Sequence, residues 1–312
     1  SDAQAEQVIA QRDRDDKKAL AFLWTGSRKE HAGLNMLKKA SIPVFYTPNK
    51  LATAVRSLLD YHSWLGQRGK AGFPAAPAIS PEQQTAAERL AATGGVALSE
   101  HQSKGLLSEW GVPMTMEKLV MNADDAVTAA DEIGYPVVLK ADVANMPHKT
   151  EAGLVMLGLR DEDAVRAAYD EVTSNAANAG AGMNGVLVQE MVADAVEVIV
   201  GVSYDSQLGA TILFGSGGVM VEVYNDVSLR LCPIDESDAL EMIAEVKGAR
   251  LLEGFRGQPA ADIAALSDTL VRVSQLGAQL EGSLAELDIN PLMVLPAGQG
   301  VRAADAVVIF QP

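Results

Sequence analysis

The chain has 312 residues, of which 48% are hydrophobic and 21% charged, and its mean hydropathy is +0.08. This composition is typical of a globular protein and excludes disordered and collagen-like chains, and the length suffices for two compact units. The formal net charge of −16, from 25 basic and 41 acidic residues, repels phosphate backbones and anionic lipid, so we expect neither a nucleic acid nor a membrane as partner.

The cysteine content and the hydropathy pattern both favour a cytoplasmic protein. Cys232 is the single cysteine, which excludes an internal disulfide and a thiolate metal cluster. The first 20 residues carry charges throughout, and no later run reaches the roughly 18 apolar residues of a membrane helix. Because the chain begins with Ser1 rather than Met, it is open whether it is a piece of a longer polypeptide.

Residues 1–66 alternate predicted strands with predicted helices. The apolar run 18–26 and the segment IPVFY (42–46) predict two strands with a helical pattern between them, and Thr47-Pro48 predicts the start of a second helix. This β-α-β-α order is typical of a parallel sheet. Two strands are too few for a doubly wound domain, so we expect only the end of an α/β domain here.

Residues 67–96 are expected to link two domains. The segment 67–80 is rich in Gly, Pro and small residues, which is the composition of a linker. Ser80 followed by Pro81 then predicts a short helix.

Residues 97–312 predict an α+β domain. Ser99 with Gln102 forms a capping-box pattern, and Asn122 precedes a second helix. The predicted strands cover 135–141, 155–159, 185–191, 196–204, 210–215, 219–224, 227–234, 284–295 and 301–310. Helices are predicted between them at 163–174, 236–249 and 261–280. Many strands with few crossover helices indicate an antiparallel or mixed sheet rather than a dinucleotide-binding one.

Two residues near a predicted loop could meet a phosphate group. Lys140 ends a strand pattern, where a buried ammonium needs an anion, which could be a ligand or the partner of a structural salt bridge. His148, beside Lys149, could donate to a phosphate or act as a nucleophile, or it could be an ordinary solvated loop histidine.

A glycine-rich turn, FGSGG (214–218), follows another predicted strand. Its N–H groups could approach an anion, although a β-turn needs the same glycines. Glu222 and Asp226 follow at a spacing of four, and solvated carboxylates explain them better than a cation site.

The strongest pattern is Glu286, Asp288 and Asn290, followed by Asp305. Alternation along a strand places the first three on one face, and the spacing to Asp305 fits a hairpin that returns alongside. Two carboxylates and an amide oxygen suit a magnesium ion that bridges nucleotide phosphates. The alternative is a solvated sheet face.

Five segments together resemble, in order, the ATP-grasp part of the NDP-forming acyl-CoA synthetases. They are YPVVLK, PHKTEAGLVMLGL, VLVQEMVADAVEVIVGV, LFGSGGVMVEVYNDVSLRLCPI and LAELDINPL. The best-known members are the ADP-forming acetate–CoA ligases, and succinyl-CoA synthetase is a more distant relative. The resemblance covers about residues 97–312 and implies an α+β ATP-grasp domain. Residues 1–66 resemble the end of the flavodoxin-like ligase-CoA domain that precedes it in fused members.

The resemblance implies roles for individual residues. Lys140 matches the lysine that contacts the nucleotide phosphates, and Glu197 is then a candidate for the ribose. His148 matches the histidine that is a second phosphoryl carrier in the ADP-forming acetate type, whose main catalytic histidine belongs to a domain outside this chain. Asp288 stands where the succinyl enzyme has a glutamate near its phosphohistidine, and we expect Asp288 to be catalytic. The interlobe hinge that contacts adenine corresponds to Gln189, Glu190, Met191 and Val192; the turn glycines near the nucleotide to Gly217 and Gly218; and the magnesium ligands to Asn290 and Asp305.

The implied reaction is carboxylate plus CoA plus ATP giving acyl-CoA, ADP and phosphate, through an acyl phosphate and a phosphohistidine. CoA would bind mainly to CoA-binding and ligase domains outside this chain, which are the expected partners, and the family also implies an oligomer. Two other functions remain open: an ATP-grasp ligase that joins a carboxylate to an amine and needs no His148, and a non-catalytic ligand-sensing module.

Overall fold

The computed structural model describes residues 2–14, 19–25, 32–72, 74–92, 97–143, 149, 152–180, 182–217, 226–254, 257 and 259–311. The chain divides into two compact units, Ser1–Phe73 and Pro74–Pro312. No helix among the described residues is both long and apolar enough to cross a membrane.

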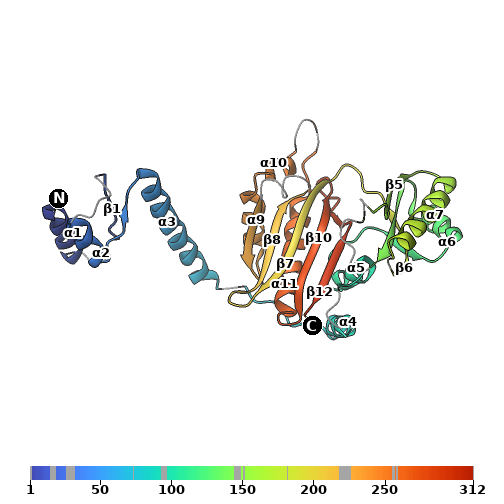
Figure 1. Ribbon diagram of the computed structural model, residues 1–312, viewed down its shortest axis with the longest axis horizontal. Helices are drawn as coiled ribbons and strands as arrows, with labels where there is room; N and C mark the ends of the chain where they lie inside the picture. The colour runs from blue at the N-terminus through green and yellow to red at the C-terminus, as the bar shows by residue number, and fades with distance from the viewer. Residues whose placement is uncertain are drawn as a thin grey trace. The chain divides into compact units, whose positions relative to one another are not determined.

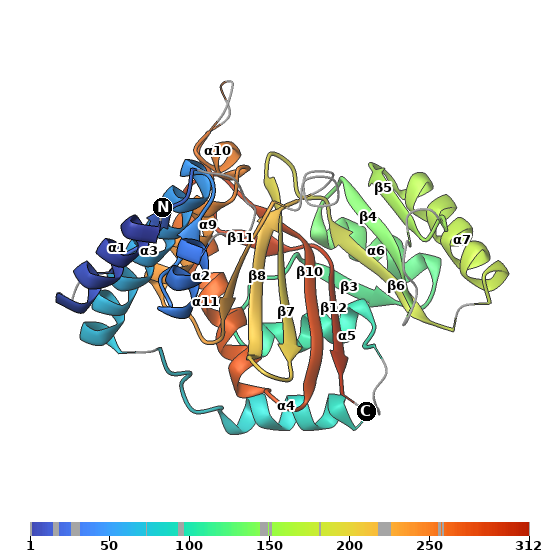
Figure 2. The same ribbon diagram turned by 60° about the vertical axis from the view of Figure 1, so that its left-hand side comes forward.

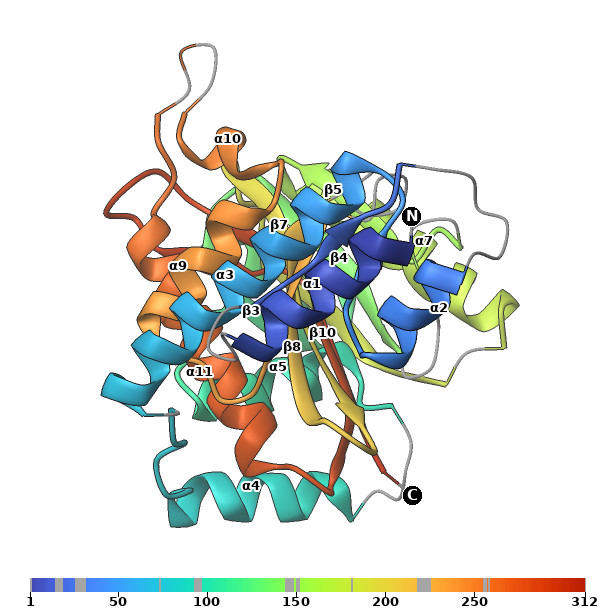
Figure 3. The ribbon, with the colours of Figure 1, turned by 90° about the vertical axis from the view of Figure 1, so that its left-hand side faces the viewer.

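Among its described residues, the first unit contains a two-stranded parallel sheet and three helices. Strands β1 (Phe22–Leu23) and β2 (Val44–Phe45) pair in parallel, as the β-α-β-α pattern predicts. The helices are α1 (Asp2–Arg14), α2 (Ala32–Lys39) and α3 (Pro48–Ala71), and α1 packs against α2 (Figure 3). Helix α1 has no apolar stripe in its sequence, and only Ala5 of it is buried, so the sequence did not predict it.

Helix α3 is longer than the sequence predicts. It runs to Ala71, so residues 67–71 are helical although they were assigned to the linker. Gln, Arg, Lys and Ala, the other residue types of this segment, have high helix propensities, which offset the low propensity of Gly69. Gly72 follows with a φ of 78°, a left-handed conformation common just after a helix, and Pro74 cannot continue it.

The second unit contains a six-stranded sheet with the order β11-β10-β7-β8-β9, in which β12 also pairs with β10. Helices α9 and α11 cover one of its faces (Figure 1). The strands and helices are β7 (Val196–Asp205), β8 (Gly209–Ser216), β9 (Val227–Leu231), β10 (Leu284–Val294), β11 (Val301–Ala303), β12 (Ala306–Phe310), α9 (Glu236–Glu245), α10 (Ala249–Leu252) and α11 (Ile263–Gln279).

A four-stranded sheet with the order β3-β6-β4-β5 completes the second unit. Its elements are β3 (Glu117–Val120), β4 (Val137–Val143), β5 (Val155–Leu159), β6 (Met183–Glu190), α6 (Ala123–Ile133) and α7 (Glu162–Asn178), and both helices pack on one face of the sheet (Figure 2). Helices α4 (Pro81–Ala91) and α5 (Glu100–Glu109) precede them in the chain. Every pairing between named strands of this unit is antiparallel, which confirms the predicted α+β class.

The predicted helix starts agree with the structure. Ser80 and Ser99 each form a complete capping box, and Asn122 caps α6. Two predicted elements are broken: the helix at 236–249 ends at Glu245, and the strand at 301–310 is interrupted at Ala304 and Asp305. The strand predicted at 219–224 lies outside the described residues.

Candidate functional site

A cleft of about 440 Å³ lies between the four-stranded and six-stranded sheets. It contains eight of the predicted site residues, which come from β4, β6, β7, β10 and the break before β12. One part of its wall is apolar and another carries charged and amide groups. The lining residues are Val138, Lys140, Val155, Leu157, Gln189, Glu190, Met191, Val192, Glu197, Asn290, Pro291, Met293, Ala304 and Asp305.

Lys140 lies in the middle of the four-stranded sheet, on a strand that is buried along its whole length. Its Nζ donates to Glu100 Oε1 at 2.8 Å and to the Ala304 carbonyl at 2.8 Å, and it lies 3.9 Å from Asp305 Oδ2. The salt bridge that the sequence left open therefore exists. An ammonium has three N–H donors, so these two hydrogen bonds leave one donor for a group in the cleft.

The hydrogen bond from Lys140 to the Ala304 carbonyl gives a physical reason for the break between β11 and β12. The Ala304 carbonyl accepts hydrogen bonds from Lys140 Nζ and, at 3.1 Å, from Gln189 Nε2. A carbonyl committed to side chains of the other sheet cannot take part in a strand ladder. The interruption places Asp305 at the cleft.

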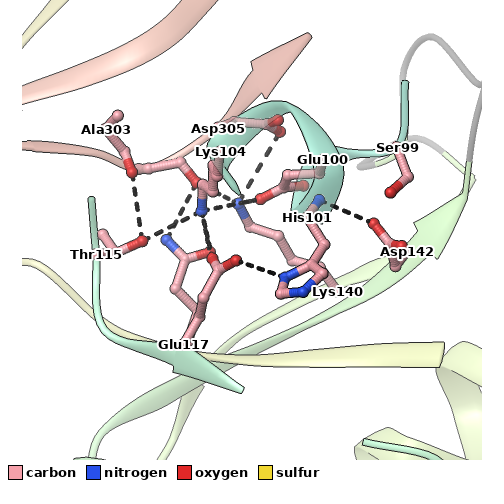
Figure 4. A network of polar contacts seen from close by, with 12 residues as sticks. Ser99, Glu100, His101, Lys104, Thr115, Glu117, Lys140, Asp142, Ala303 and Asp305 are labelled. Carbon is pink, nitrogen blue, oxygen red and sulfur yellow. Dashed lines mark hydrogen bonds and ion pairs between the residues drawn. The ribbon is translucent and has the colours of Figure 1, made fainter. Parts of the chain in front are cut away.

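Glu100 is the centre of a buried network (Figure 4). Its side chain is fully buried, and its carboxylate meets three lysines: Lys140 at 2.8 Å, Lys149 at 2.9 Å and Lys104 at 3.3 Å. Lys104 in turn pairs with Glu117 at 2.6 Å. Burial alone would raise the pKa of Glu100, but the lysines, Lys140 foremost, outweigh it and hold that pKa well below its ordinary value. Glu100 is therefore ionised.

Lys149 belongs to the same network. Burial alone would lower its pKa, but Glu100 first, and Asp305 after it, hold the pKa above its ordinary value. Its backbone carbonyl accepts from Leu154, which is fully buried in the core beneath the four-stranded sheet. The charged side chain is thus held at the network rather than in solvent.

Strand β10, which carries Glu286, Asp288 and Asn290, forms the hairpin that the sequence predicts. The Asn290 N–H donates to the Asp305 carbonyl at 3.1 Å, and both residues line the cleft. Asp288 lies on the same face of β10 but outside the cleft lining. Burial first, and then Glu286 and Asp305, raise the pKa of Asp288 to about 6. Burial of the Asp305 carboxylate first, and the negative charge of Glu100 after it, raise the pKa of Asp305.

Asn290 and Asp305 alone supply only some of the oxygen ligands that a magnesium ion needs. Magnesium prefers oxygen ligands and often uses one or two carboxylates together with substrate phosphates. Among the described residues, no group of three or more His, Cys, Asp or Glu is arranged to hold a metal ion. An amide oxygen and one carboxylate therefore suit a metal that arrives with a nucleotide.

The segment from Gln189 to Val192 closes the cleft where β6 ends. Gln189 is buried, and Glu190 accepts from the backbone N–H of Met116 at 2.8 Å. Met191 is 40% exposed and lines the cleft beside Val192. Glu197 lines the cleft from the start of β7.

Gly217 lies outside the cleft lining and packs against β7. Its N–H donates to the Glu197 carbonyl at 2.9 Å, and a Cβ at this position would lie 2.5 Å from the same oxygen. Asp226 is not a solvated carboxylate, because it is 5% exposed and accepts from Ser216 Oγ and from the N–H groups of Lys247 and Gly248. His148, Gly218 and Glu222 lie outside the described residues.

Sequence reasoning missed Glu100 and Lys104. They are four residues apart on α5, a spacing that on most helices marks an exposed ion pair. The one available signal was their place in the first turns of a helix that opens with a capping box and has few apolar residues. That signal cannot distinguish a buried pair from an exposed one.

Comparison with known proteins identifies the family of the chain. The family model described as ATP-grasp domain matches residues 89–310. The beta subunit of an ADP-forming acetate–CoA ligase II from Pyrococcus furiosus is 38% identical over 226 residues, which are 72% of this chain and 96% of that subunit. An ADP-forming acetate–CoA ligase I from Archaeoglobus fulgidus is 36% identical over 85% of this chain, but the match spans only 39% of that longer protein.

A solved structure shares the fold. It is a dinucleotide-forming acetyl-coenzyme A synthetase 1 from Ca. Korarchaeum cryptofilum in complex with coenzyme A and Mg-AMPPCP, with a phosphohistidine segment pointing towards the nucleotide binding site. It is 38% identical with a TM-score of 0.64, and the match covers 73% of this chain and 100% of that one. The chain therefore belongs to the ATP-grasp family, and its relatives there include ADP-forming acetate–CoA ligases, as the five sequence segments predict.

Proposed function

We propose that this chain is the nucleotide-binding, phosphoryl-transferring part of an ADP-forming acyl-CoA synthetase. The observation that supports this most is the convergence, in one cleft, of a buried lysine, a pair of oxygen ligands and an apolar wall. ATP or ADP would place its adenine against apolar residues such as Leu157 and Met191, and its phosphates toward Lys140. Glu197 would then meet the ribose.

Asn290 and Asp305 would hold a magnesium ion together with the phosphate oxygens. When bound, the ion supplies charge neutralisation for the phosphates. Lys140 binds a phosphate oxygen through its remaining N–H. The apolar wall and the buried network limit water around the phosphates, which strengthens these contacts.

The proposed reaction moves one phosphoryl group through histidine carriers. The bond from the γ-phosphorus to its bridging oxygen breaks to release ADP as a bond to a nitrogen of His148 forms. The group then passes to the main catalytic histidine, expected in the ligase domain outside this chain, and from it to the substrate carboxylate, each phosphorus–nitrogen bond breaking as the next bond to phosphorus forms. The resulting acyl phosphate reacts with the CoA sulfur, which displaces phosphate from the acyl carbon. A carrier histidine is useful because direct transfer needs the reacting atoms within about 3–3.5 Å. Asp288 would act near the carrier.

The rest of the site would come from partner domains. Residues 1–66 resemble the end of a ligase-CoA domain, and we propose 67–96 as the connection to the ATP-grasp domain at 97–312. CoA and the carboxylic acid would bind mainly to the CoA-binding and ligase domains, in the same polypeptide or a separate chain. The assembled enzyme would be an oligomer.

The experiment is labelling by ATP that carries the label on its γ-phosphate, in the presence of magnesium. We expect an acid-labile phosphoryl group on the chain, lost in His148→Ala while the affinity for ATP is retained. His62→Ala, on an exposed helix, is the matched control and should keep the label. Label that is acid-stable or that persists in His148→Ala, or ATP binding without any label, would favour a different ATP-grasp ligase or a sensing module.

A further inference from the structure

The carboxylate of Glu100 has an unusual number of cationic partners for a fully buried group. It meets lysines from α5, from β4 and from residue 149, at 3.3, 2.8 and 2.9 Å. A buried charge is tolerated only with partners, and here three share one carboxylate. Neither the sequence patterns nor the family resemblance assigns Glu100 a role.

Two of the three lysines have other partners that hold them in place. Lys104 contacts Glu117 at 2.6 Å and Thr115 at 3.2 Å. Lys140 contacts the Ala304 carbonyl at 2.8 Å and lies 3.9 Å from Asp305. Glu100 is therefore not required to orient these two ammonium groups. What it adds to them is negative charge.

Glu100 is one of several carboxylates that surround the three lysines. Three ammonium groups face the three carboxylates of Glu100, Glu117 and Asp305. Two further titratable groups pack nearby: Asp142, which accepts from the His101 N–H, and the His101 ring, which contacts Glu117. Asp142 also helps to hold the pKa of Lys149 above its ordinary value, so it belongs to the same set of charges. Glu100 differs from the other carboxylates because all three lysines contact it, and removing it takes away the negative charge that lies nearest to them together.

We propose that Glu100 is the internal counter-anion of the phosphate site, a positioning residue that acts through Lys140 and Lys149 to weaken the binding of polyphosphates. The proposal rests on the proposed function, because it assumes that Lys140 meets nucleotide phosphates. Glu100 and a bound phosphate would contact the same lysine, so the negative charge of Glu100 would repel the negative charges of the phosphates. Little solvent lies between them to screen this repulsion. The cleft can then bind a nucleotide and still release it.

The test compares ATP with AMP, both titrated calorimetrically in magnesium buffer. The two ligands share adenine and ribose, so the ratio of their affinities isolates the phosphate contribution. We expect Glu100→Gln to raise the preference for ATP over AMP by about tenfold, which corresponds to about 1.4 kcal/mol of charge interaction. AMP affinity should change much less. A merely structural role would lower both affinities together or leave their ratio unchanged.

Matched variants separate charge from packing. Glu100→Asp keeps the charge and should leave the ratio near that of the wild type, and Glu109→Gln, on an exposed residue of the same helix, should do so as well. Lys149→Met should lower the preference for ATP by about tenfold, because Glu100 is then shared by two lysines. This variant decides the question if Glu100→Gln does not fold.

The outcomes are distinguishable. If wild-type protein binds ATP but a folded Glu100→Gln variant does not raise the preference for ATP, the counter-anion role is wrong and the proposed function stands. The same holds if Glu100→Gln does not fold and Lys149→Met does not lower the preference. If wild-type protein binds neither nucleotide, the proposed function itself fails, and the counter-anion role fails with it.

Discussion

Lys140 Nζ and Asp305 Oδ2 lie 3.9 Å apart, although Lys140 belongs to the four-stranded sheet and Asp305 follows β11 of the six-stranded sheet. The distance is that of an ion pair rather than of a hydrogen bond. It brings the proposed phosphate ligand and a proposed magnesium ligand to one point of the cleft, where the two sheets meet.

Replacing Lys140 with methionine should weaken ATP binding by about 10- to 100-fold, because a hydrogen bond from a charged donor contributes roughly 1.5–3 kcal/mol. Isothermal titration calorimetry measures this. Lys118→Met is the matched control, since Lys118 is an exposed lysine on β3 that pairs with Glu132. Equal ATP affinity in Lys140→Met and wild type would remove Lys140 from the phosphate site.

Asp305→Asn should make ATP binding nearly independent of magnesium, because it removes the carboxylate of the proposed ligand pair. The measurement is the ATP affinity with magnesium and with EDTA. Glu286→Gln changes a carboxylate on the neighbouring strand β10 that does not line the cleft, and should keep the magnesium dependence. If Asp305→Asn retains the full magnesium effect, the metal ligands lie elsewhere.

Much of the fold could be predicted because the local signals were strong. Ser80, Ser99 and Asn122 carry capping side chains, and the hairpin from Asn290 to Asp305 follows from strand alternation and spacing. The break at Ala304 could not be predicted, because it depends on Lys140 and Gln189 from a different sheet.

The site was predicted only where its residues lie in recognisable segments. Eight of these residues do meet in one cleft, but Glu100 was missed, because its burial depends on β4 and on Lys149 rather than on its own helix. Asp226 was interpreted as solvated for a similar reason. The backbone N–H groups that bind it come from residues 247 and 248, which sequence proximity does not indicate.

Gly217→Ala should lower the free energy of unfolding by about 1–3 kcal/mol, because the added Cβ would lie 2.5 Å from the Glu197 carbonyl oxygen. Thermal or urea unfolding measures the change. Gly182→Ala is the matched control, since a Cβ there has no described atom within 4 Å. A Gly217→Ala protein as stable as the wild type would contradict the close packing against β7.

Asp226→Ala should lower the free energy of unfolding by about 2–4 kcal/mol at pH 7, because it removes the acceptor of the buried Gly248 N–H, the partly buried Lys247 N–H and the buried Ser216 hydroxyl. Burial would raise the pKa of Asp226, but the hydrogen bonds from Ser216, Lys247 and Gly248 outweigh it and hold the pKa below its ordinary 3.8. A lowered folded-state pKa contributes stability that is present above the unfolded value and lost as the pH falls through the folded one.

The difference between wild type and Asp226→Ala should therefore shrink as the pH falls below 3.8. Unfolding measured from pH 7 to pH 3 checks this, with Asp170→Ala on an exposed helix face as control. A difference that stays constant over this range would show that the carboxylate charge is not what stabilises the contact.

The central claim is that the cleft between the two sheets binds a magnesium nucleotide, and calorimetry of the wild-type chain with ATP tests it most directly. We predict saturable binding of one ATP per chain with magnesium, and binding weakened at least about tenfold by EDTA. No binding of ATP or ADP with or without magnesium would contradict the claim.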